Sequence, residues 1–257
     1  MAKTEYGLQM FSLRDITGTD LKGALKQVAE MGYRYVEFAG LFGNRPEDVK
    51  VWLDEYGLVC SGTHTGKPGL EDDTIDATIA CHKILGCANL IIPGGFDWST
   101  QEKLDENIVF INKAQKKLAE NGITLGYHNH SQEFMTTPYG AVVEDEIIRR
   151  TSLELEIDTW WAYNAGIDPV AYLETYKDRI RVIHLKDGIA AKPECRTYAR
   201  CHEGVEGKSV GSGEAPILAI RDWCLHNNVL MVIESEGLNP SGPEEVKRCI
   251  DFLRTLD

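Results

Sequence analysis

The feature of this chain that most limits its fold is the regular alternation of short apolar segments with longer amphipathic ones. Eight short segments have the length and composition of buried strands. They span 7–11, 33–38, 58–63, 88–92, the start of the stretch 123–134, 152–157, 180–185 and 229–235. Alternating strands and helices predict parallel strands. Eight such units in 257 residues predict a closed (β/α)8 barrel of the α/β class, a TIM barrel forming one domain over 1–257.

An open, doubly wound sheet is the main alternative fold. Such a sheet usually carries a glycine-rich turn after its first strand, but here residues 12–15 read Ser-Leu-Arg-Asp. Ser99 and Glu102 have the spacing of a capping box, so Ser99 is expected to cap the longest helix. The segment 187–213 is polar and rich in glycine, and its length indicates a functional loop. The helices are expected over 20–30, 44–57, 73–85, 99–122, 139–150, 169–176, 214–227 and 243–256.

Charge and composition exclude several classes of protein. The formal net charge is −13, with 27 Lys and Arg scattered among 40 acidic residues, so no basic face for nucleic acid is expected. No apolar run approaches the ~20 residues that a membrane helix needs. The N-terminal residues lack the apolar region of a secretory signal, which favours a cytoplasmic protein. The seven cysteines form no CxxC pair and are expected to be reduced.

Four of the strand-like segments end in side chains that can bind a metal ion. His128, Asp158, His184 and Glu234 follow or close the fifth to eighth strands. Active sites of (β/α)8 barrels lie at the carboxyl ends of the strands, so these four side chains are expected to converge. Two imidazoles and two carboxylates suit Mn²⁺, Zn²⁺, Co²⁺ or Fe²⁺, with coordination positions left for substrate oxygens. The sequence therefore predicts a divalent-metal site at the mouth of the barrel.

The alternation of side chains along a strand extends this prediction to neighbouring residues. Lys186 shares a face with His184, and Glu156 shares a face with Asp158. A buried Glu156 would need a partner, and His130 or a lysine is the expected one. Lys186 could donate to a developing oxyanion or a leaving hydroxyl, or it could only balance the charge of Glu156.

Several short motifs are spread over nearly the whole chain, and their order and spacing are distinctive. They are GLQMFSLRD (7–15), YHNH (127–130), EF (133–134), EIDTW (156–160), GIDP (166–169), VIHLKD (182–187), VGSG (210–213) and IESE (233–236). Through these motifs the chain resembles the xylose-isomerase-like TIM-barrel superfamily of sugar isomerases and epimerases. The resemblance implies a divalent metal, with Mn²⁺ favoured, bound by Asp158, His184 and Glu234 together with a residue of the fifth strand. That fourth ligand is usually a glutamate in the family, whereas this chain has His128.

The resemblance also implies a mechanism, in which a base removes the proton beside a metal-polarised carbonyl. Glu234 is the expected base, His128 or His130 is the alternative, and Lys186 is the expected proton donor. In the epimerases two ligand glutamates move protons on opposite faces of the sugar. Because this chain has His128 in place of one of them, only Glu234 remains of that pair. The histidine form of the motif is similar to inosose dehydratases and related keto-sugar lyases. A keto-sugar dehydratase, hydratase or lyase is therefore the alternative to a sugar isomerase or epimerase.

A second group of residues is expected to bind a small sugar or keto-sugar substrate. It contains Gln9, Glu37, His64, Glu133 and Trp160, each of which also has a structural interpretation. Four cations could meet a phosphate, but no glycine-rich phosphate loop is present, which favours an unphosphorylated substrate. These cations are Arg14, Arg196, Arg200 and Lys208.

Two further classes of function are weighed against these. A DNA-repair endonuclease of the same fold would need a multi-zinc cluster and a basic groove, and the charge of −13 argues against it. A non-catalytic binder would have no need for four metal-capable strand ends. The sequence leaves a homo-oligomer open and indicates no partner among nucleic acids or membranes.

Overall fold

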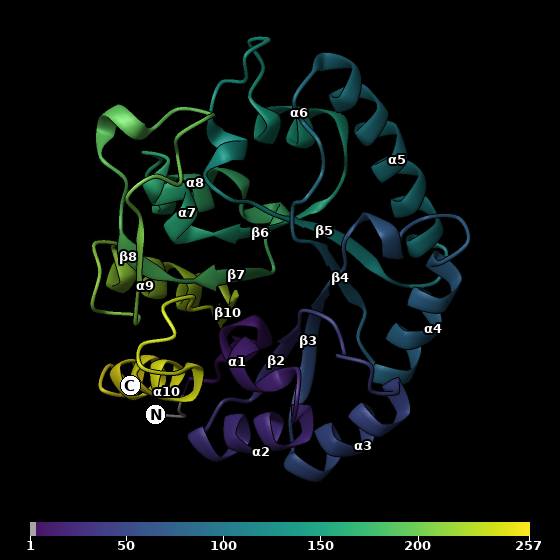
Figure 1. The fold of residues 1–257 in the computed structure, drawn as a ribbon, viewed down its shortest axis with the longest axis vertical. Coiled ribbons are helices and arrows are strands. Elements are labelled where there is room, and N and C mark those ends of the chain that lie inside the picture. Colours follow the sequence, from purple (N-terminus) through teal and green to yellow (C-terminus); the bar gives the residue numbers. More distant parts are fainter. Residues whose placement is uncertain (1–3) are drawn as a thin grey trace.

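The computed structural model describes residues 4–257 and shows eight parallel strands closed into a barrel with helices around it (Figure 1). The barrel strands are β1 (Gly7–Gln9), β2 (Tyr35–Phe38), β3 (Val59–His64), β4 (Asn89–Ile92), β5 (Thr124–His128), β6 (Glu154–Asp158), β7 (Val182–Leu185) and β10 (Leu230–Ile233). Around the barrel their order is β1-β10-β7-β6-β5-β4-β3-β2, and β2 closes the ring on β1. The predicted (β/α)8 barrel is confirmed.

Helices connect successive strands on the outside of the barrel. They are α1 (Arg14–Thr17), α2 (Leu21–Met31), α3 (Pro46–Tyr56), α4 (Ile75–Leu85), α5 (Gln101–Ala119), α6 (Val143–Arg150), α7 (Thr159–Asn164), α8 (Pro169–Tyr176), α9 (Ile217–Asn227) and α10 (Gly242–Arg254). In α2, the side chain of Asp20 accepts a hydrogen bond from the backbone N–H of Gly23. The helix ends at Gly32, whose φ of 93° suits glycine.

The structure corrects two local expectations about helix starts. Ser99 does not cap α5, because the hydroxyl of Thr100 accepts the hydrogen bond from the backbone N–H of Lys103 at 3.2 Å. The helix expected over 139–150 is shorter and begins at Val143. Residues 137–141 instead form a turn, in which the backbone N–H of Thr137 donates to the carbonyl of Ala141 at 2.8 Å, so α6 begins only after this turn.

The segment 187–213 is more ordered than its composition indicates. It contains an antiparallel pair of strands, β8 (Asp187–Ile189) and β9 (Glu206–Lys208). The buried carboxylate of Asp187 accepts hydrogen bonds from the backbone N–H groups of Gly188, Gly211, Gly213 and Ala215 at 2.9–3.1 Å. A Cβ at residue 213 would lie 2.2 Å from that carboxylate, so only glycine fits there. These bonds tie the segment to the end of β7.

The apolar core lies between the barrel and the helices. Leu8 of β1 and Val36 of β2 pack in one cluster with Leu25 of α2. Their neighbours along the strands, Gln9 and Glu37, are fully buried and point to the opposite side, into the barrel. The helices therefore cover an apolar outer surface of the sheet, while the barrel encloses polar side chains.

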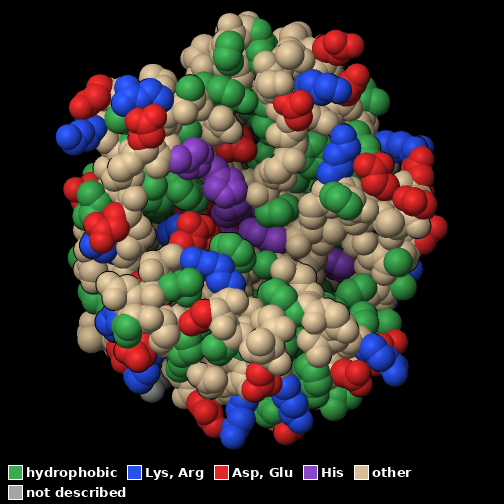
Figure 2. All heavy atoms as spheres, in the orientation of Figure 1, with side chains coloured by type: hydrophobic (Ala, Val, Ile, Leu, Met, Phe, Trp, Pro, Cys, Tyr) green, Lys and Arg blue, Asp and Glu red, His purple; other side chains and the backbone are tan. Residues whose placement is uncertain are grey.

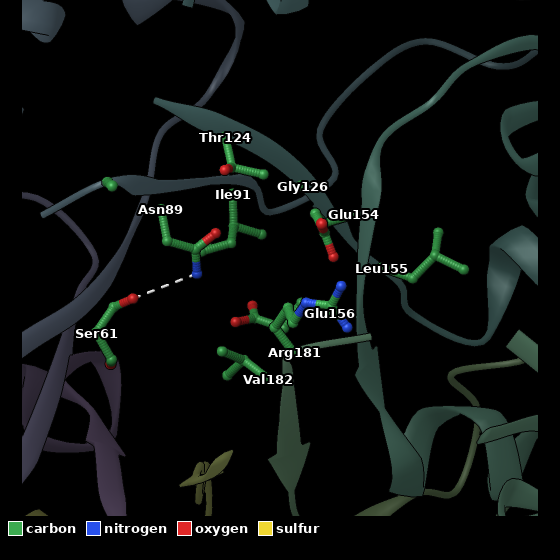
Figure 3. A pocket seen from close by; sticks show the side chains of 11 residues that line it. Ser61, Asn89, Ile91, Thr124, Gly126, Glu154, Leu155, Glu156, Arg181 and Val182 are labelled. Atoms are coloured by element: carbon green, nitrogen blue, oxygen red, sulfur yellow. Dashed lines mark hydrogen bonds between the residues drawn. The ribbon is translucent and has the colours of Figure 1, made fainter. Parts of the chain in front are cut away.

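Histidine side chains gather near the centre of the face seen in Figure 1, as the space-filling view shows (Figure 2). At the other end of the barrel, where the strands begin, lies a separate cavity of about 380 Å³ (Figure 3). Asn89, Thr124 and Glu154, the first residues of three neighbouring strands, line this cavity together with Glu156. The polar interior thus extends along β6 from one end of the barrel towards the other.

In the part of the chain that the structure describes, no helix combines the length and the apolar character needed to span a membrane. This agrees with the expectation from the sequence.

We expect Glu144 of α6 to make stability fall as pH rises. The pKa of Glu144 is raised to about 8, chiefly by burial and also by the nearby Glu133 and Asp145, although the hydrogen bond from Tyr172 and the charge of Arg179 act to lower it. Because this pKa exceeds the value of 4.5 for an unfolded chain, stability is lost between about pH 4.5 and 8. Glu144→Gln keeps an acceptor for the hydroxyl of Tyr172 and removes this loss.

Thermal unfolding of Glu144→Gln at pH 5 and pH 9 tests this expectation. The variant should match the unmodified protein at pH 5 and be more stable at pH 9 by about 1–3 kcal/mol, on the scale of 1.4 kcal/mol per pKa unit. Glu120→Gln, the same substitution at an exposed position after α5, is the matched control. An equal difference at both pH values would contradict the assignment of a buried, protonated Glu144.

Candidate metal centre

The four predicted strand-end residues lie together at the mouth of the barrel. His128 and Asp158 close β5 and β6, His184 lies in β7, and Glu234 directly follows β10. All four are buried, and one ligand atom from each lies within 4.8 Å of the ligand atoms of the others. Strand register explains this, because Asp158 pairs with His184 across β6 and β7, and His184 pairs with Val232 of β10.

The donor atoms of this cluster fit a divalent cation. Among the residues described, His128 Nδ1 and Asp158 Oδ2 are buried and have no hydrogen-bond partner, so their lone pairs are free for a ligand bond. The other carboxylate oxygen, Asp158 Oδ1, accepts hydrogen bonds from the backbone N–H groups of Trp160 and Trp161 at 2.9 and 2.8 Å. These bonds fix the direction in which Oδ2 points.

The ionisation of the cluster also fits a cation. Burial and the nearby His184 and His64 lower the pKa of His128, so its imidazole is neutral and can donate a lone pair. Burial raises the pKa of Asp158 to about 7, although Lys186 lowers it. A buried carboxylate with this pKa lacks sufficient positive charge around it, which a divalent cation would supply.

A layer of polar side chains beneath the cluster orients His184. Nε2 of His184 lies 2.9 Å from Glu37 Oε1, and Nδ1 lies 3.3 Å from Glu234 Oε2. The side-chain amide of Gln9 donates to the same oxygen of Glu37 at 2.6 Å. Gln9 and Glu37 are fully buried, so the structure places both behind the ligands rather than on the pocket surface.

The partner of Glu156, which the sequence left open, is His64. Instead of His130 or a lysine, Nε2 of His64 lies 2.8 Å from Glu156 Oε2 and 2.8 Å from Glu37 Oε1. His64 closes β3, the longest barrel strand, and its side chain reaches across the interior to β6. His64 and Glu156 also form, with His128 and His184, a second group whose ligand atoms lie within 4.8 Å of one another.

Lys186 is a buried ammonium surrounded by acids. Its Nζ lies 2.8 Å from Glu236 Oε1, 3.2 Å from Glu234 Oε2 and 3.8 Å from Asp158 Oδ2. The alternative expectation, a charge-balancing ion pair with an inward acid, is met by Glu234 and Asp158 rather than by Glu156. Burial alone would lower the pKa of Lys186, but Glu234 and the other two acids hold it above its usual value. Lys186 is protonated at neutral pH.

A pocket of about 330 Å³ opens above the cluster. It is lined by Phe11, Ala39, His64, Pro93, His128, His130, Glu234 and Glu236. The sequence analysis missed Phe11 and Glu236 as lining residues, because both lie just past a strand end, where side-chain alternation no longer gives direction. The recurrence of acids at 234 and 236 was the one signal that could have found Glu236.

Two other residues expected to bind substrate have different surroundings. Glu133 is buried, where it accepts hydrogen bonds from the hydroxyl of Tyr127 at 3.1 Å and the backbone N–H of His130 at 2.9 Å. It thereby holds the loop that carries His130. Trp160 is 1% exposed and packs against Trp161, so it lies outside the pocket surface.

The fold and this site define a (β/α)8 barrel protein with a candidate divalent-metal centre at the carboxyl ends of its strands. The chain belongs to the xylose isomerase-like TIM barrel family, whose model matches residues 25–256. It is 28% identical to an inosose dehydratase of Geobacillus kaustophilus over 194 residues. This alignment covers 63% of the chain and 60% of that relative, so the chain spans less than two thirds of it.

Solved structures share the fold over almost the whole chain. A sugar phosphate isomerase/epimerase from Parabacteroides distasonis has a TM-score of 0.79 at 22% identity, covering 98% of this chain and 94% of that one. The probable 3-DHS dehydratase from Bacillus anthracis has a TM-score of 0.73 at 15% identity, with coverage of 98% and 99%. The relatives thus include isomerases or epimerases and dehydratases, and the chain is similar to enzymes.

We expect His184→Ala to lose stoichiometric divalent metal while the barrel stays folded. The imidazole contributes a ligand atom, and its loss leaves room without an apolar clash. Metal content after dialysis, measured by elemental analysis beside circular dichroism, checks this. His226→Ala, an exposed position on α9, is the control and should keep its metal. Unchanged metal content in His184→Ala would show that the centre is misplaced.

Glu37→Gln should weaken metal binding by about 10–100-fold without abolishing it, as expected for a residue that orients a ligand. The amide carries no charge and cannot hold both His184 and His64 as acceptor. Titration with Mn²⁺, followed by calorimetry, measures the change. Glu47→Gln, exposed on α3, is the matched control. A Glu37→Gln protein with unaltered Mn²⁺ affinity would remove Glu37 from this role.

Proposed function

We propose that this protein is a divalent-metal-dependent sugar isomerase or epimerase that removes a proton beside a carbonyl. The observation that carries the proposal is the position of Glu234. Its carboxylate belongs to the metal-capable cluster, lies on the surface of the pocket and approaches the ammonium of Lys186 to 3.2 Å. A base, a proton donor and a metal-capable cluster thus meet at one place where a small sugar can bind.

Glu234 is the proposed base. Burial would raise its pKa, but Lys186 and His184 hold that pKa well below its usual value, so the carboxylate is ionised at neutral pH. An ionised carboxylate on the pocket surface can accept a proton from a carbon beside the carbonyl. Lys186, held by Glu234 and Glu236, is the proposed donor to the substrate oxygen that gains charge.

His130 is the proposed group that accepts a proton from the substrate hydroxyl whose oxygen becomes the new carbonyl. It lines the pocket, and burial lowers its pKa, so a neutral imidazole is available to take that proton, while protonated Glu234 returns its own to carbon. The ring of His130 lies 5.1 Å from that of His128, while Glu133 holds its backbone in place. A divalent cation would be held by His128, Asp158, His184 and Glu234, with Mn²⁺ expected over Zn²⁺, Co²⁺ or Fe²⁺, and would supply polarisation of the carbonyl.

A keto-sugar dehydratase, hydratase or lyase is the second candidate. Two observations favour it: His128 stands where the two-glutamate epimerases carry a second acid, and a 28% identical relative is an inosose dehydratase. In this reaction Glu234 would take the proton beside the carbonyl. Lys186, which is protonated, would then give a proton to the departing hydroxyl group.

Incubation of the Mn²⁺-loaded protein with ketoses and keto-inositols in D₂O tests the proposal by NMR. Deuterium in an isomerised product supports the isomerase, and a dehydrated product supports the second candidate. Glu234→Gln should slow deuterium exchange by about 10²–10⁴-fold, because a positioned base contributes this much. Metal content of the variant is measured in parallel. Full exchange by Glu234→Gln with metal bound would show that another residue is the base.

A further inference from the structure

The charges around the pocket identify the class of substrate. We propose that the site takes an uncharged polyhydroxy ketone and rejects its phosphate ester, with Glu236 as the residue that determines this specificity. The inference rests on the proposed function, because it concerns the substrate of the same site. A preference for unphosphorylated substrates would distinguish this protein from the sugar phosphate isomerase/epimerase that has the same fold.

Among the described residues that line the pocket there is no lysine or arginine to bind an anion. Its charged or titratable lining consists of the carboxylates Glu234 and Glu236 and the imidazoles of His64, His128 and His130. Lys186 lies behind this surface, 1% exposed, with both carboxylates in contact with its ammonium. A phosphate at the mouth would therefore meet Glu236, whose side chain is 34% exposed, before it met Lys186.

Three of the four cations that the sequence offered for a phosphate have other partners. Arg14 donates to the backbone carbonyls of Phe11 and Glu236 at 3.1 and 2.8 Å. Arg200 pairs with Glu203 at 2.9 Å, and Lys208 pairs with Glu206.

Arg196, the fourth of these cations, faces a different cavity. Its neighbours there include Gly166 and Asp168 on the outside of the barrel, and it does not line the pocket at the mouth.

The fixed charge below the pocket adds to this selectivity. Five carboxylates lie in this region around one lysine and the imidazoles of His64 and His184, so acids outnumber these basic side chains. The five acids are Glu37, Glu156, Asp158, Glu234 and Glu236. A second anion at the mouth gains no net attraction from this group.

The same lining suits a neutral sugar. Phe11, Ala39 and Pro93 provide an apolar wall, and the ring of Phe11 is 40% exposed. An apolar wall can cover the C–H face of a sugar, and carboxylate oxygens accept hydrogen bonds from its hydroxyl groups. Glu236 is free to accept such bonds on the oxygen that does not face Lys186.

Calorimetric binding of matched neutral and phosphorylated sugars to the Mn²⁺-loaded protein tests the inference. The probes are D-fructose with D-fructose 6-phosphate, D-xylulose with D-xylulose 5-phosphate, and scyllo-inosose. We expect a neutral probe to bind at least 10-fold more tightly than its phosphate ester. Glu236→Gln should shrink that ratio at least threefold by improving phosphate binding. Glu244→Gln, exposed on α10, is the matched control and should leave it unchanged.

The outcomes separate this inference from the proposed function. Tighter binding of the phosphate esters, or an unchanged ratio in Glu236→Gln, would overturn the inference even if deuterium exchange occurs. Preferred binding of neutral probes without proton exchange in D₂O would overturn the proposed chemistry and leave the substrate class standing. Binding of no probe at all would overturn both.

Discussion

The structure of the barrel interior depends on the burial of Lys186 among acids. Moving an ammonium out of water is costly, and the contacts with Glu234, Glu236 and Asp158 offset that cost. Lys186 in turn keeps Glu234 ionised on the pocket surface. Removal of either Lys186 or Glu234 would leave the other as a buried charge with fewer partners, which is destabilising. The chemistry of the site is therefore coupled to the electrostatics that allow the barrel to enclose it.

The backbone around Lys186 is fixed from the outside as well. Asp187, the next residue, points away from the barrel and binds four backbone N–H groups of the segment that follows β7. Trp161 supports the other side, with its ring 4.8 Å from the ammonium. The hairpin of β8 and β9 thus stabilises the position of Lys186. A Cβ at residue 211 would lie 2.5 Å from Phe252 and one at residue 213 would lie 2.2 Å from Asp187, which is the physical reason for glycine at both.

The sequence allowed the barrel and the four strand-end residues to be predicted, because both follow from local patterns. Alternation along a strand assigns His184 and Lys186 to the interior without knowledge of the rest of the fold. Contacts across the barrel could not be predicted in this way. The pairing of His64 with Glu156 depends on how far β3 extends relative to β6, and β2 and β3 are shifted in register between Val36 and Glu37. Such offsets arise only when the barrel closes.

The acids beneath the site give a physical reason for a histidine rather than a glutamate at residue 128. Nδ1 of His128 lies 3.6 Å from Glu156 Oε2, and Glu37 shares His64 with that carboxylate. A glutamate at residue 128 would place another negative charge against Glu156 in a region already rich in acids, and such pairs of carboxylates resist ionising together. A neutral imidazole avoids this repulsion and still offers a lone pair to a metal. The lower layer of carboxylates and the single base, Glu234, are thus parts of one electrostatic arrangement.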